Sequence, residues 1–320
     1  MRSRRALLAA LLCAGCTATA NPAPLPPSPF TPSPVRHLTL AAAGNICGVP
    51  DACADTADRV LEARPDLVLT LGDMAYEDGL LSEFHRRYGG GTTPPTGWGR
   101  QEIRAITLPG FGNHDCYDTD AKLGCDGAVD YFGQDASFGE DIPGTSGSYS
   151  LVRGEWLIVV LNSAGDNGSG RATPQEVADQ DGALGELLAR DEHTCEIVAW
   201  HHPRFSSGAE GGSGSHVAAW FDTAYRNAVD VILNAHHHQY ERFAPQDPGG
   251  QRTGNGVRAF VVGTGGAPLE PFGSPLPNSE ARFSEWGILT MALGDDGTYS
   301  WAFVDDMTGG VFDEGSGVCH

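Results

Sequence analysis

The segment Leu67–Gly79 carries the residue that we expect at the centre of this protein's chemistry. It begins with Leu67–Leu71, a run of apolar and β-branched residues that predicts a buried strand. Gly72 interrupts the run, and the polar residues Asp73 and Tyr76 follow it. Polar residues in this position lie at the carboxyl edge of a sheet, where open α/β sheets hold their ligands. Because a carboxylate can bridge two cations, we expect Asp73 to organise a metal site at this edge.

Four other predicted strands also end in polar groups. They cover residues 38–43, 106–108, 196–200 and 229–233. The groups that follow them are Asn45, then Asn113 with His114, then His201, and last His236 with His238. If the sheet is largely parallel in this part of the chain, all five strand ends meet at one edge. Imidazole, amide and carboxylate groups gathered there could together complete the coordination of metal ions.

The two histidine motifs leave simpler alternatives open. Residues 235–242 read A-H-H-H-Q-Y-E-R, and in an extended backbone His236 and His238 would point one way and His237 the other. Two imidazoles on one side suit metal ligation, whereas the alternative is a histidine cluster on the surface. In the pair His201 and His202, the alternative places one ring in the core and leaves the other exposed.

Composition limits the class of partner. The chain has 320 residues, enough for one large domain or two small ones. Its formal net charge of -21 argues against a nucleic-acid partner held by counterion release, which needs a basic surface. With 43 glycines and 21 prolines, the chain is expected to be globular and rich in loops. No internal repeat and no shift in composition marks a second domain.

Residues 1–20 predict an export signal. Three arginines precede the apolar run 6–13, which is too short to span a bilayer, and the pattern resembles a twin-arginine signal. Two kinds of processing stay open, because residues 18–20 fit a signal-peptidase site and residues 13–16 fit a lipoprotein box that would be acylated on Cys16. The proline-rich residues 21–35 predict an extended tether. We therefore expect a catalytic domain over residues 36–320.

Six of the eight cysteines lie after the predicted signal. An even number in an oxidising compartment predicts disulfides, and fifteen pairings are possible in principle. Proximity in the sequence favours Cys47–Cys53 and Cys116–Cys125, which leaves Cys195–Cys319. The alternative is a metal cluster of cysteine and histidine, against which no C-x-x-C pair occurs after the signal.

Apolar periodicity predicts βαβ units first and antiparallel strands later, around one core. Helices are expected over residues 56–64, 80–88, 174–190 and 217–226. Further strands are expected over residues 148–152, 156–161, 258–262, 287–293 and 298–304.

Taken in order, the motifs G-D-x-x-Y, G-N-H-D, W-H-H-P and H-x-H-x-Y-E-R resemble those of the calcineurin-like metallophosphoesterases. Tyr76 resembles the tyrosine of their purple acid phosphatase branch. The resemblance extends from residue 38 to about residue 305. It implies an α/β fold, a four-layer sandwich of two mixed β-sheets flanked by helices, with two metal ions at one edge.

The resemblance also assigns roles to single residues. Asp73 would bridge the two metals. The first site, usually ferric in the purple branch, would be completed by Asn45, Tyr76 and His238. The second site, usually zinc, manganese or ferrous iron, would be completed by Asn113, His201 and His236. His114 would bind no metal and would face the phosphoryl group and the leaving oxygen.

Two departures from the family pattern concern the first motif. Asn45 stands where the family has an aspartate ligand, so one negative charge is missing, and we expect metal binding there to be ~10–100-fold weaker. Cys47 stands where a histidine is frequent, which argues against the nuclease-like branches. In the last motif Ala235 replaces the usual glycine, which is tolerated if its φ is negative.

These observations predict an exported binuclear phosphoesterase that acts on phosphate monoesters. Two cations ~3.5–4 Å apart would clamp the ester and generate a metal hydroxide that attacks phosphorus. His114 would donate a proton to the leaving oxygen, and Asp115 would orient His114 or its loop. Substrate contacts are expected from His202, Arg204 and His216.

Two alternative functions stay open. One is a phosphodiesterase that uses the same site, and the other is a surface protein that binds phosphate or metal with weakened catalysis because of Asn45. In either case the expected partner is a small phosphate ester, with no nucleic acid, and a membrane is involved only through a lipid at Cys16.

Overall fold

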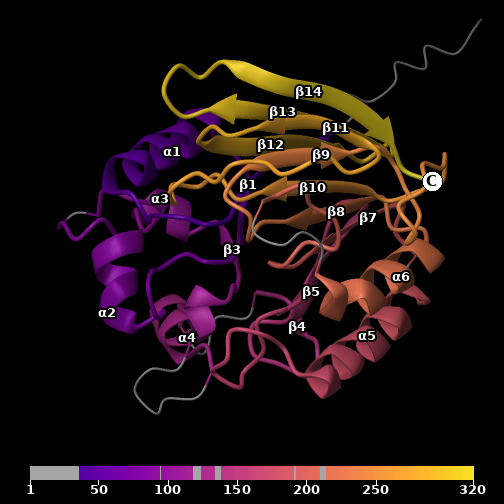
Figure 1. Cartoon of the computed structure of the whole chain (residues 1–320), viewed down its shortest axis with the longest axis horizontal. Coiled ribbons are helices and arrows are strands. Elements are labelled where there is room, and N and C mark those ends of the chain that lie inside the picture. Colours follow the sequence, from indigo (N-terminus) through magenta and orange to yellow (C-terminus); the bar gives the residue numbers. More distant parts are fainter. Residues whose placement is uncertain (1–35, 94, 118–123, 134–137, 191, 210–213) are drawn as a thin grey trace, which may run out of the picture. The chain divides into compact units, whose positions relative to one another are not determined.

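The computed structural model describes residues 36–320 apart from 94, 118–123, 134–137, 191 and 210–213 (Figure 1). The predicted export signal and tether therefore lie outside the described residues. The described chain forms two mixed β-sheets with helices beside them, as the resemblance implied. None of its helices combines the length and apolar character that crossing a bilayer requires.

The first sheet has the strand order β14-β13-β12-β1-β2-β3. Its parallel half contains β1 (His37–Ala43), β2 (Leu67–Leu71) and β3 (Thr107–Gly110). Its antiparallel half contains β12 (Gly287–Gly294), β13 (Thr298–Asp305) and β14 (Val311–Val318). The three amino-terminal strands are therefore aligned, and their carboxyl ends lie at the same edge.

The second sheet has the order β11-β9-β10-β8-β7-β6-β5-β4. Its parallel centre is made of β6 (Trp156–Val160), β7 (Cys195–Ala199), β8 (Val231–Asn234) and β10 (Arg258–Val262). The antiparallel strands at its sides are β4 (Glu140–Asp141), β5 (Tyr149–Arg153), β9 (Tyr240–Phe243) and β11 (Ser279–Phe283).

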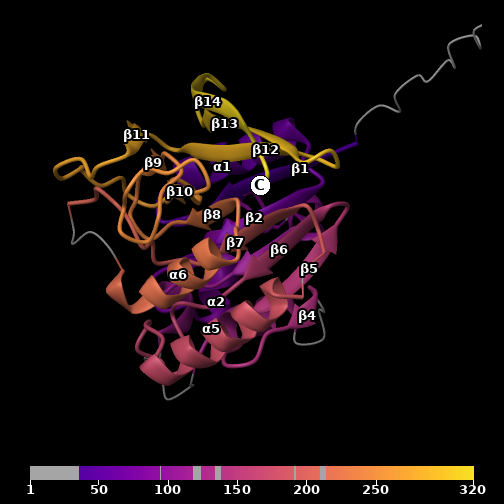
Figure 2. The ribbon, with the colours of Figure 1, turned by 90° about the vertical axis from the view of Figure 1, so that its right-hand side faces the viewer.

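Alternate residues of the second sheet serve two different cores. Ile158, Ile197 and Leu233 belong to the core shared with the first sheet. Their neighbours Val159, Val198 and Ile232 belong to a second core that also contains residues of helices α5 (Pro174–Leu188) and α6 (Ala218–Arg226). This follows from the two-residue period of a strand, and it explains why these strands are apolar without interruption. Figure 2 shows α5 and α6 along the outer side of β7 and β8.

The helices and helical turns are α1 (Pro50–Ala63), α2 (Leu81–Glu83), η1 (Phe84–Tyr88), α3 (Gln101–Arg104), η2 (His114–Cys116), α4 (Asp126–Phe132), α5 (Pro174–Leu188), η3 (Ser215–Val217) and α6 (Ala218–Arg226). The helix expected over 56–64 begins earlier, at Pro50, because proline is favoured in the first turn of a helix. Thr173 accepts a hydrogen bond from the Glu176 backbone and so starts α5 where it was predicted.

Two expectations about strands were wrong. The five strand ends do not belong to one sheet, because β1, β2 and β3 lie in the first sheet and β7 and β8 in the second. The strands β4, β9, β11 and β14 were not predicted. β14 and β11 contain many polar residues because much of their surface is exposed or half-buried, so their apolar pattern is weak.

The three disulfides pair as sequence proximity favoured. They are Cys47–Cys53, Cys116–Cys125 and Cys195–Cys319. The alternative of a metal cluster built on these cysteines is therefore wrong. The third bond joins the first residue of β7 to the tail that follows β14, and it is the link that spans the longest stretch of sequence.

Candidate metal centre

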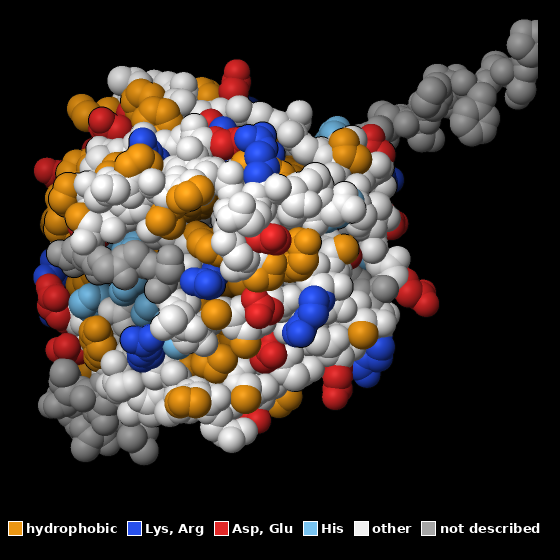
Figure 3. All heavy atoms as spheres, turned by 45° about the vertical axis from the view of Figure 1, so that its right-hand side comes forward, with side chains coloured by type: hydrophobic (Ala, Val, Ile, Leu, Met, Phe, Trp, Pro, Cys, Tyr) orange, Lys and Arg blue, Asp and Glu red, His pale blue; other side chains and the backbone are white. Residues whose placement is uncertain are grey.

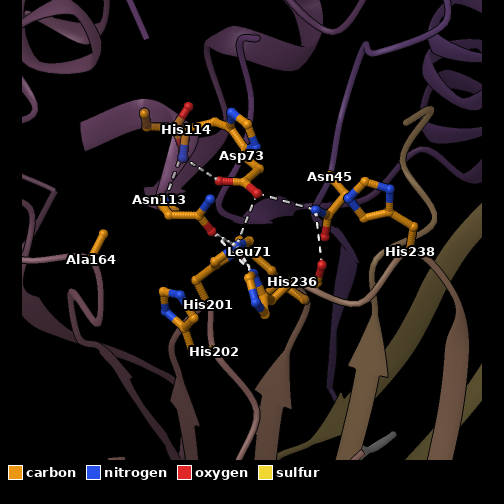
Figure 4. A network of polar contacts seen from close by, with 12 residues as sticks. Asn45, Leu71, Asp73, Asn113, His114, Ala164, His201, His202, His236 and His238 are labelled. Atoms are coloured by element: carbon orange, nitrogen blue, oxygen red, sulfur yellow. Dashed lines mark hydrogen bonds and ion pairs between the residues drawn. The ribbon is translucent and has the colours of Figure 1, made fainter. Parts of the chain in front are cut away.

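The carboxyl ends of strands from both sheets meet at one place, and polar side chains from five of them gather there (Figure 4). The contributing strands are β1, β2 and β3 of the first sheet and β7 and β8 of the second. Their side chains are Asn45, Asp73, Asn113, His201 and His236. The expectation that these groups converge is thus met by two sheets together rather than by one.

Four predicted ligand atoms of the second site lie within hydrogen-bonding distance of one another. The Nε2 atom of His201 is 3.1 Å from Asp73 Oδ2 and 3.1 Å from Asn113 Oδ1. The Nδ1 atom of His236 is 3.0 Å from the same Asn113 oxygen and 3.3 Å from His201 Nε2. Two imidazole nitrogens and two oxygens at this spacing suit a transition-metal cation.

The ring of His201 is held in the orientation that a metal ligand needs. Its Nδ1 atom lies 2.7 Å from the carbonyl oxygen of Leu71. A carbonyl only accepts, so Nδ1 carries a proton, and Nε2, which faces Asp73 and Asn113, is the nitrogen that a metal would bind in place of a proton. Gly72 permits this approach, since a Cβ atom there would lie 2.6 Å from His201 Nδ1 and its φ is +90°.

The predicted ligands of the first site lie around the same Asp73 oxygen. Asn45 Nδ2 is 3.2 Å from Asp73 Oδ2 and 3.2 Å from the hydroxyl oxygen of Tyr76. His238 lies beside Asn45 in Figure 4, and its Nδ1 atom is 2.7 Å from the carbonyl oxygen of Pro268, which leaves Nε2 for a metal. The Oδ1 atom of Asn45 is buried without a hydrogen-bond partner. This oxygen lies beside Gly263, while the amide nitrogen faces Asp73 and Tyr76, so Oδ1 could bind a cation at this site only if the amide turned.

Unusual backbone angles turn three of these side chains toward the centre. Asn45, Asp73 and His236 have φ values of 53°, 54° and 67°, a region in which Asn, Asp and His are enriched among non-glycine residues. The extended backbone considered for residues 236–238 is therefore wrong. His237 nevertheless points elsewhere, to the hydroxyl of Ser206. Ala235 is not among the residues with positive φ, so it can replace glycine there.

The charges of the centre suit metal binding. Burial by itself would raise the pKa of Asp73, but the neighbouring His201 imidazole outweighs it, so the pKa lies below its usual range. Burial opposes a charge on His201, but the Asp73 carboxylate raises its pKa overall. Burial and the nearby His201 lower the pKa of His236 to about 3. At neutral pH Asp73 is therefore ionised and His236 is neutral, the forms in which each binds a metal.

His114 lies at the rim of the centre. Its backbone N–H donates to Asp73 Oδ1 at 2.8 Å, and its Nδ1 atom is 2.6 Å from the carbonyl oxygen of Glu77. The ring packs against Tyr76, with ring centroids 4.5 Å apart. Because Nδ1 carries the proton toward Glu77, the Nε2 side of the ring is left for a substrate.

Asp115 contacts the loop that carries His114 rather than the ring of His114. One of its carboxylate oxygens accepts hydrogen bonds from the backbone of Met74 and Ala75, and the other accepts from Gly112. The side chain is buried. These three hydrogen bonds therefore brace the two loops that carry Asp73 and Asn113, and none of them is with the ring of His114.

We expect Asp115→Ala to lower the free energy of unfolding of the metal-free protein by about 3 kcal/mol, because three buried N–H groups lose their acceptor. Urea unfolding measures this change, and Glu285→Ala, at an exposed position, is the matched control. Metal affinity should fall as well, since the loops of both sites are loosened. Loss of turnover with unchanged stability and metal affinity would instead assign Asp115 to the reaction itself.

The predicted substrate contacts divide into two groups. The ring of His202 lies 4.3 Å from that of His236 and 5.0 Å from that of His216, so these histidines form a row beside the centre. Burial and neighbouring histidines lower the pKa of His202, and burial lowers that of His216 to about 4. The guanidinium of Arg204 stacks on Phe205 instead. None of the three predicted contacts, His202, Arg204 and His216, is among the described residues that line the cavity at the centre.

Sequence reasoning missed Glu270, which lines this cavity. One of its oxygens accepts from the His238 backbone at 3.4 Å, and the other is 3.7 Å from His238 Nδ1. Glu270 follows β10, which is parallel to β8, so the strand-end rule that found the other residues applied here too. Arg171, whose charge acts on His202 and His216, was also missed, because it lies in a loop with no such signal.

The cavity has a volume of about 170 Å³. It is lined by Asp73, Asn113, His114, His236, His237, His238 and Glu270. Figure 3 shows histidine side chains gathered in one area of the surface. The centre is therefore reached from solvent. The roles of its residues are predictions.

Comparison with known proteins identifies the family. The sequence profile of the calcineurin-like phosphoesterases matches residues 40–240. The chain belongs to this family. No curated protein sequence matches the chain.

Solved structures support the same fold at low sequence identity. Purple acid phosphatase PPD1 from yellow lupin seeds has a TM-score of 0.69 and 17% identity, over 88% of this chain and 53% of that chain. GAP50, described as the anchor in the inner membrane complex of Plasmodium, has a TM-score of 0.65 and 14% identity, over 89% of both chains. PhoD has a TM-score of 0.56 and 10% identity, over 88% and 68%. This chain thus spans about half the length of the lupin structure.

Proposed function

We propose that this protein is an exported phosphatase that hydrolyses phosphate monoesters at a centre for two metal ions. The observation that supports it best is the convergence of Asp73, Asn113, His201 and His236 on one point, with His114 at the rim. Three disulfides support a destination outside the reducing cytoplasm. The likeness to the lupin purple acid phosphatase supports a phosphatase, and a comparison of a monoester with a diester substrate decides between the two classes.

Two sets of residues would hold the ions, and they share Asp73. One set is Asn113, His201 and His236, and the other is Asn45, Tyr76 and His238. Bound ions would supply Lewis-acid activation of the phosphoryl group and a hydroxide nucleophile from water. The residues of the chain position the ester: His114, in the form protonated on both ring nitrogens, would donate a hydrogen bond from Nε2 to the phosphoryl group and then that proton to the leaving oxygen. The neutral rings of His202 and His216 would contact the remaining part of the substrate.

Hydrolysis of a chromogenic ester tests the proposal. The purified protein, loaded with Mn²⁺ or Zn²⁺, should release nitrophenol from p-nitrophenyl phosphate faster than from bis(p-nitrophenyl) phosphate, and a chelator should stop the reaction. Faster cleavage of the diester would favour the diesterase. Tight metal binding without hydrolysis of either ester would favour a binding protein.

A binding protein is the second candidate because Asn45 removes one anionic ligand from the first site. GAP50, which shares the fold, is described as an anchor. Inorganic phosphate that binds to the metal-loaded protein, combined with turnover at the assay background, would support this candidate.

His114→Ala should lower kcat by about 10²–10³-fold, because a proton donor and a hydrogen bond to the transition state are lost together. Metal content should not change, since the contact of His114 with Asp73 is made by the backbone N–H, which alanine retains. Steady-state kinetics and elemental analysis measure the two quantities. His37→Ala, at an exposed position on β1, is the control, and a kcat equal to the parent's would remove His114 from the reaction.

A further inference from the structure

The two halves of the metal centre are not equally prepared to receive a cation. On the side of Asn113, His201 and His236, the Asn113 oxygen faces two imidazole nitrogens, each of which becomes a ligand once it carries no proton, and His201 is fixed by Leu71. A cation that enters there replaces the contacts among these atoms and leaves the surrounding hydrogen bonds in place. This half is therefore organised in advance for a metal.

On the other side the amide of Asn45 already holds the oxygens that would bind the metal. Its Nδ2 atom is 3.2 Å from Asp73 Oδ2, 3.2 Å from Tyr76 Oη and 3.4 Å from the carbonyl oxygen of His236 (Figure 4). An N–H donor and a cation are attracted to the same oxygens, so the amide nitrogen and a first-site metal compete. An aspartate at this position would have no N–H group with which to compete.

The oxygen of Asn45 faces the wrong way for a ligand. Oδ1 is buried without a partner and lies near the backbone of Gly263, where an added Cβ atom would be 2.8 Å away. If the amide turns to offer Oδ1 to a metal, its NH₂ group loses the three acceptors and faces Gly263 instead. A buried donor without a partner weakens binding by up to about 100-fold, in addition to the missing negative charge.

Glu270 keeps the first site from losing metal altogether. Its carboxylate lies against the His238 backbone and 3.7 Å from His238 Nδ1, so it places a negative charge behind that ring. This charge still attracts a cation. It lies next to His238 Nδ1, which contacts the carbonyl oxygen of Pro268, and not next to Nε2, the nitrogen left for a metal. The first site is therefore weakened and not abolished.

We propose that the centre binds its two cations in separate steps, and that Asn45 sets the affinity of the second step. One cation binds tightly between Asp73, Asn113, His201 and His236. The other binds beside Asn45, Tyr76 and His238 at least about 100-fold more weakly, so that its occupancy follows the free metal concentration. This inference rests on the metal centre of the proposed function, but it concerns binding and requires no turnover.

The test is a binding isotherm of the metal-free full-length protein with Mn²⁺, by calorimetry and equilibrium dialysis. The parent should bind one equivalent tightly and a second about 100-fold more weakly. Asn45→Asp should tighten the weak step by ~10–100-fold and bring the two steps together. The matched control is Asn113→Asp, which adds the same charge on the other side and should tighten the first step, so that the steps move further apart.

Two results would overturn the inference: two equal equivalents in the parent, or an unchanged weak step in Asn45→Asp. If Asn45→Asp does not fold, His238→Ala replaces it and should remove the weak step while the tight step stays. Loss of the tight step instead would also overturn the inference. Because no ester is used, a protein that binds metal in two steps but hydrolyses nothing would contradict only the proposed function.

Discussion

Replacing Asp73 by alanine is expected to reduce ester hydrolysis to the assay background, a fall of at least about 10³-fold. Asp73 is 1% exposed, and its Oδ2 atom is the one oxygen that lies within 3.2 Å of both Asn45 and His201. No other carboxylate of the described residues is so placed between the two halves of the centre. Its removal takes away the shared ligand and the charge that keeps two cations close together.

Metal content distinguishes this effect from a loss of folding. Asp73→Ala should bind less than one equivalent of Mn²⁺ by equilibrium dialysis, while its circular dichroism spectrum stays that of the parent. Asp179→Ala, an exposed carboxylate on α5, should change neither metal content nor turnover. A variant at Asp73 that keeps parental hydrolysis would show that the chemistry takes place elsewhere.

Removal of the Cys195–Cys319 disulfide is expected to lower the free energy of unfolding by about 5 kcal/mol. The two cysteines are 124 residues apart, and closing so long a loop restricts the unfolded chain strongly. In a chain of this size the corresponding fall in Tm is roughly 5–10 °C. Cys195→Ser with Cys319→Ser, studied by calorimetry and urea unfolding, measures the change.

The Cys116–Cys125 pair provides the matched control. It closes a loop of 9 residues, so its replacement by two serines should cost only about half as much, about 2.5 kcal/mol. The tail near Cys319 keeps a second attachment, since His320 donates from its backbone to Asp230 at 3.0 Å. Turnover at low temperature should therefore survive in the Cys195/Cys319 variant. Equal losses in the two double variants would contradict a loop-length explanation.

Much of the centre could be predicted because its signals are local. A buried strand followed by a turn places the next polar side chain at a sheet edge, and this rule located Asn45, Asp73, Asn113, His201 and His236. The two nearby disulfides were favoured because short loops close easily. Glu270 obeys the same strand-end rule and was overlooked, since it lies eight positions after β10 ends at Val262.

Other features could not be predicted because they depend on contacts between distant segments. Asp115 follows His114 in the sequence, yet its carboxylate is directed to backbone groups of the Asp73 loop. Arg204 lies near His202 in the sequence, but its guanidinium packs on Phe205. In both cases the direction of a side chain is decided by the surface against which its loop folds, and spacing along the chain contains no such information.

The sequence by itself determined the types of ligand, their order along the chain and the strand ends that carry them, because side-chain chemistry and strand periodicity are local properties. Only the tertiary structure decided that two sheets share the centre and that the Asn45 amide presents nitrogen rather than oxygen to Asp73. The physical reason is that an amide turns toward whichever acceptors surround it, and those acceptors come from β2, from Tyr76 and from the loop after β8.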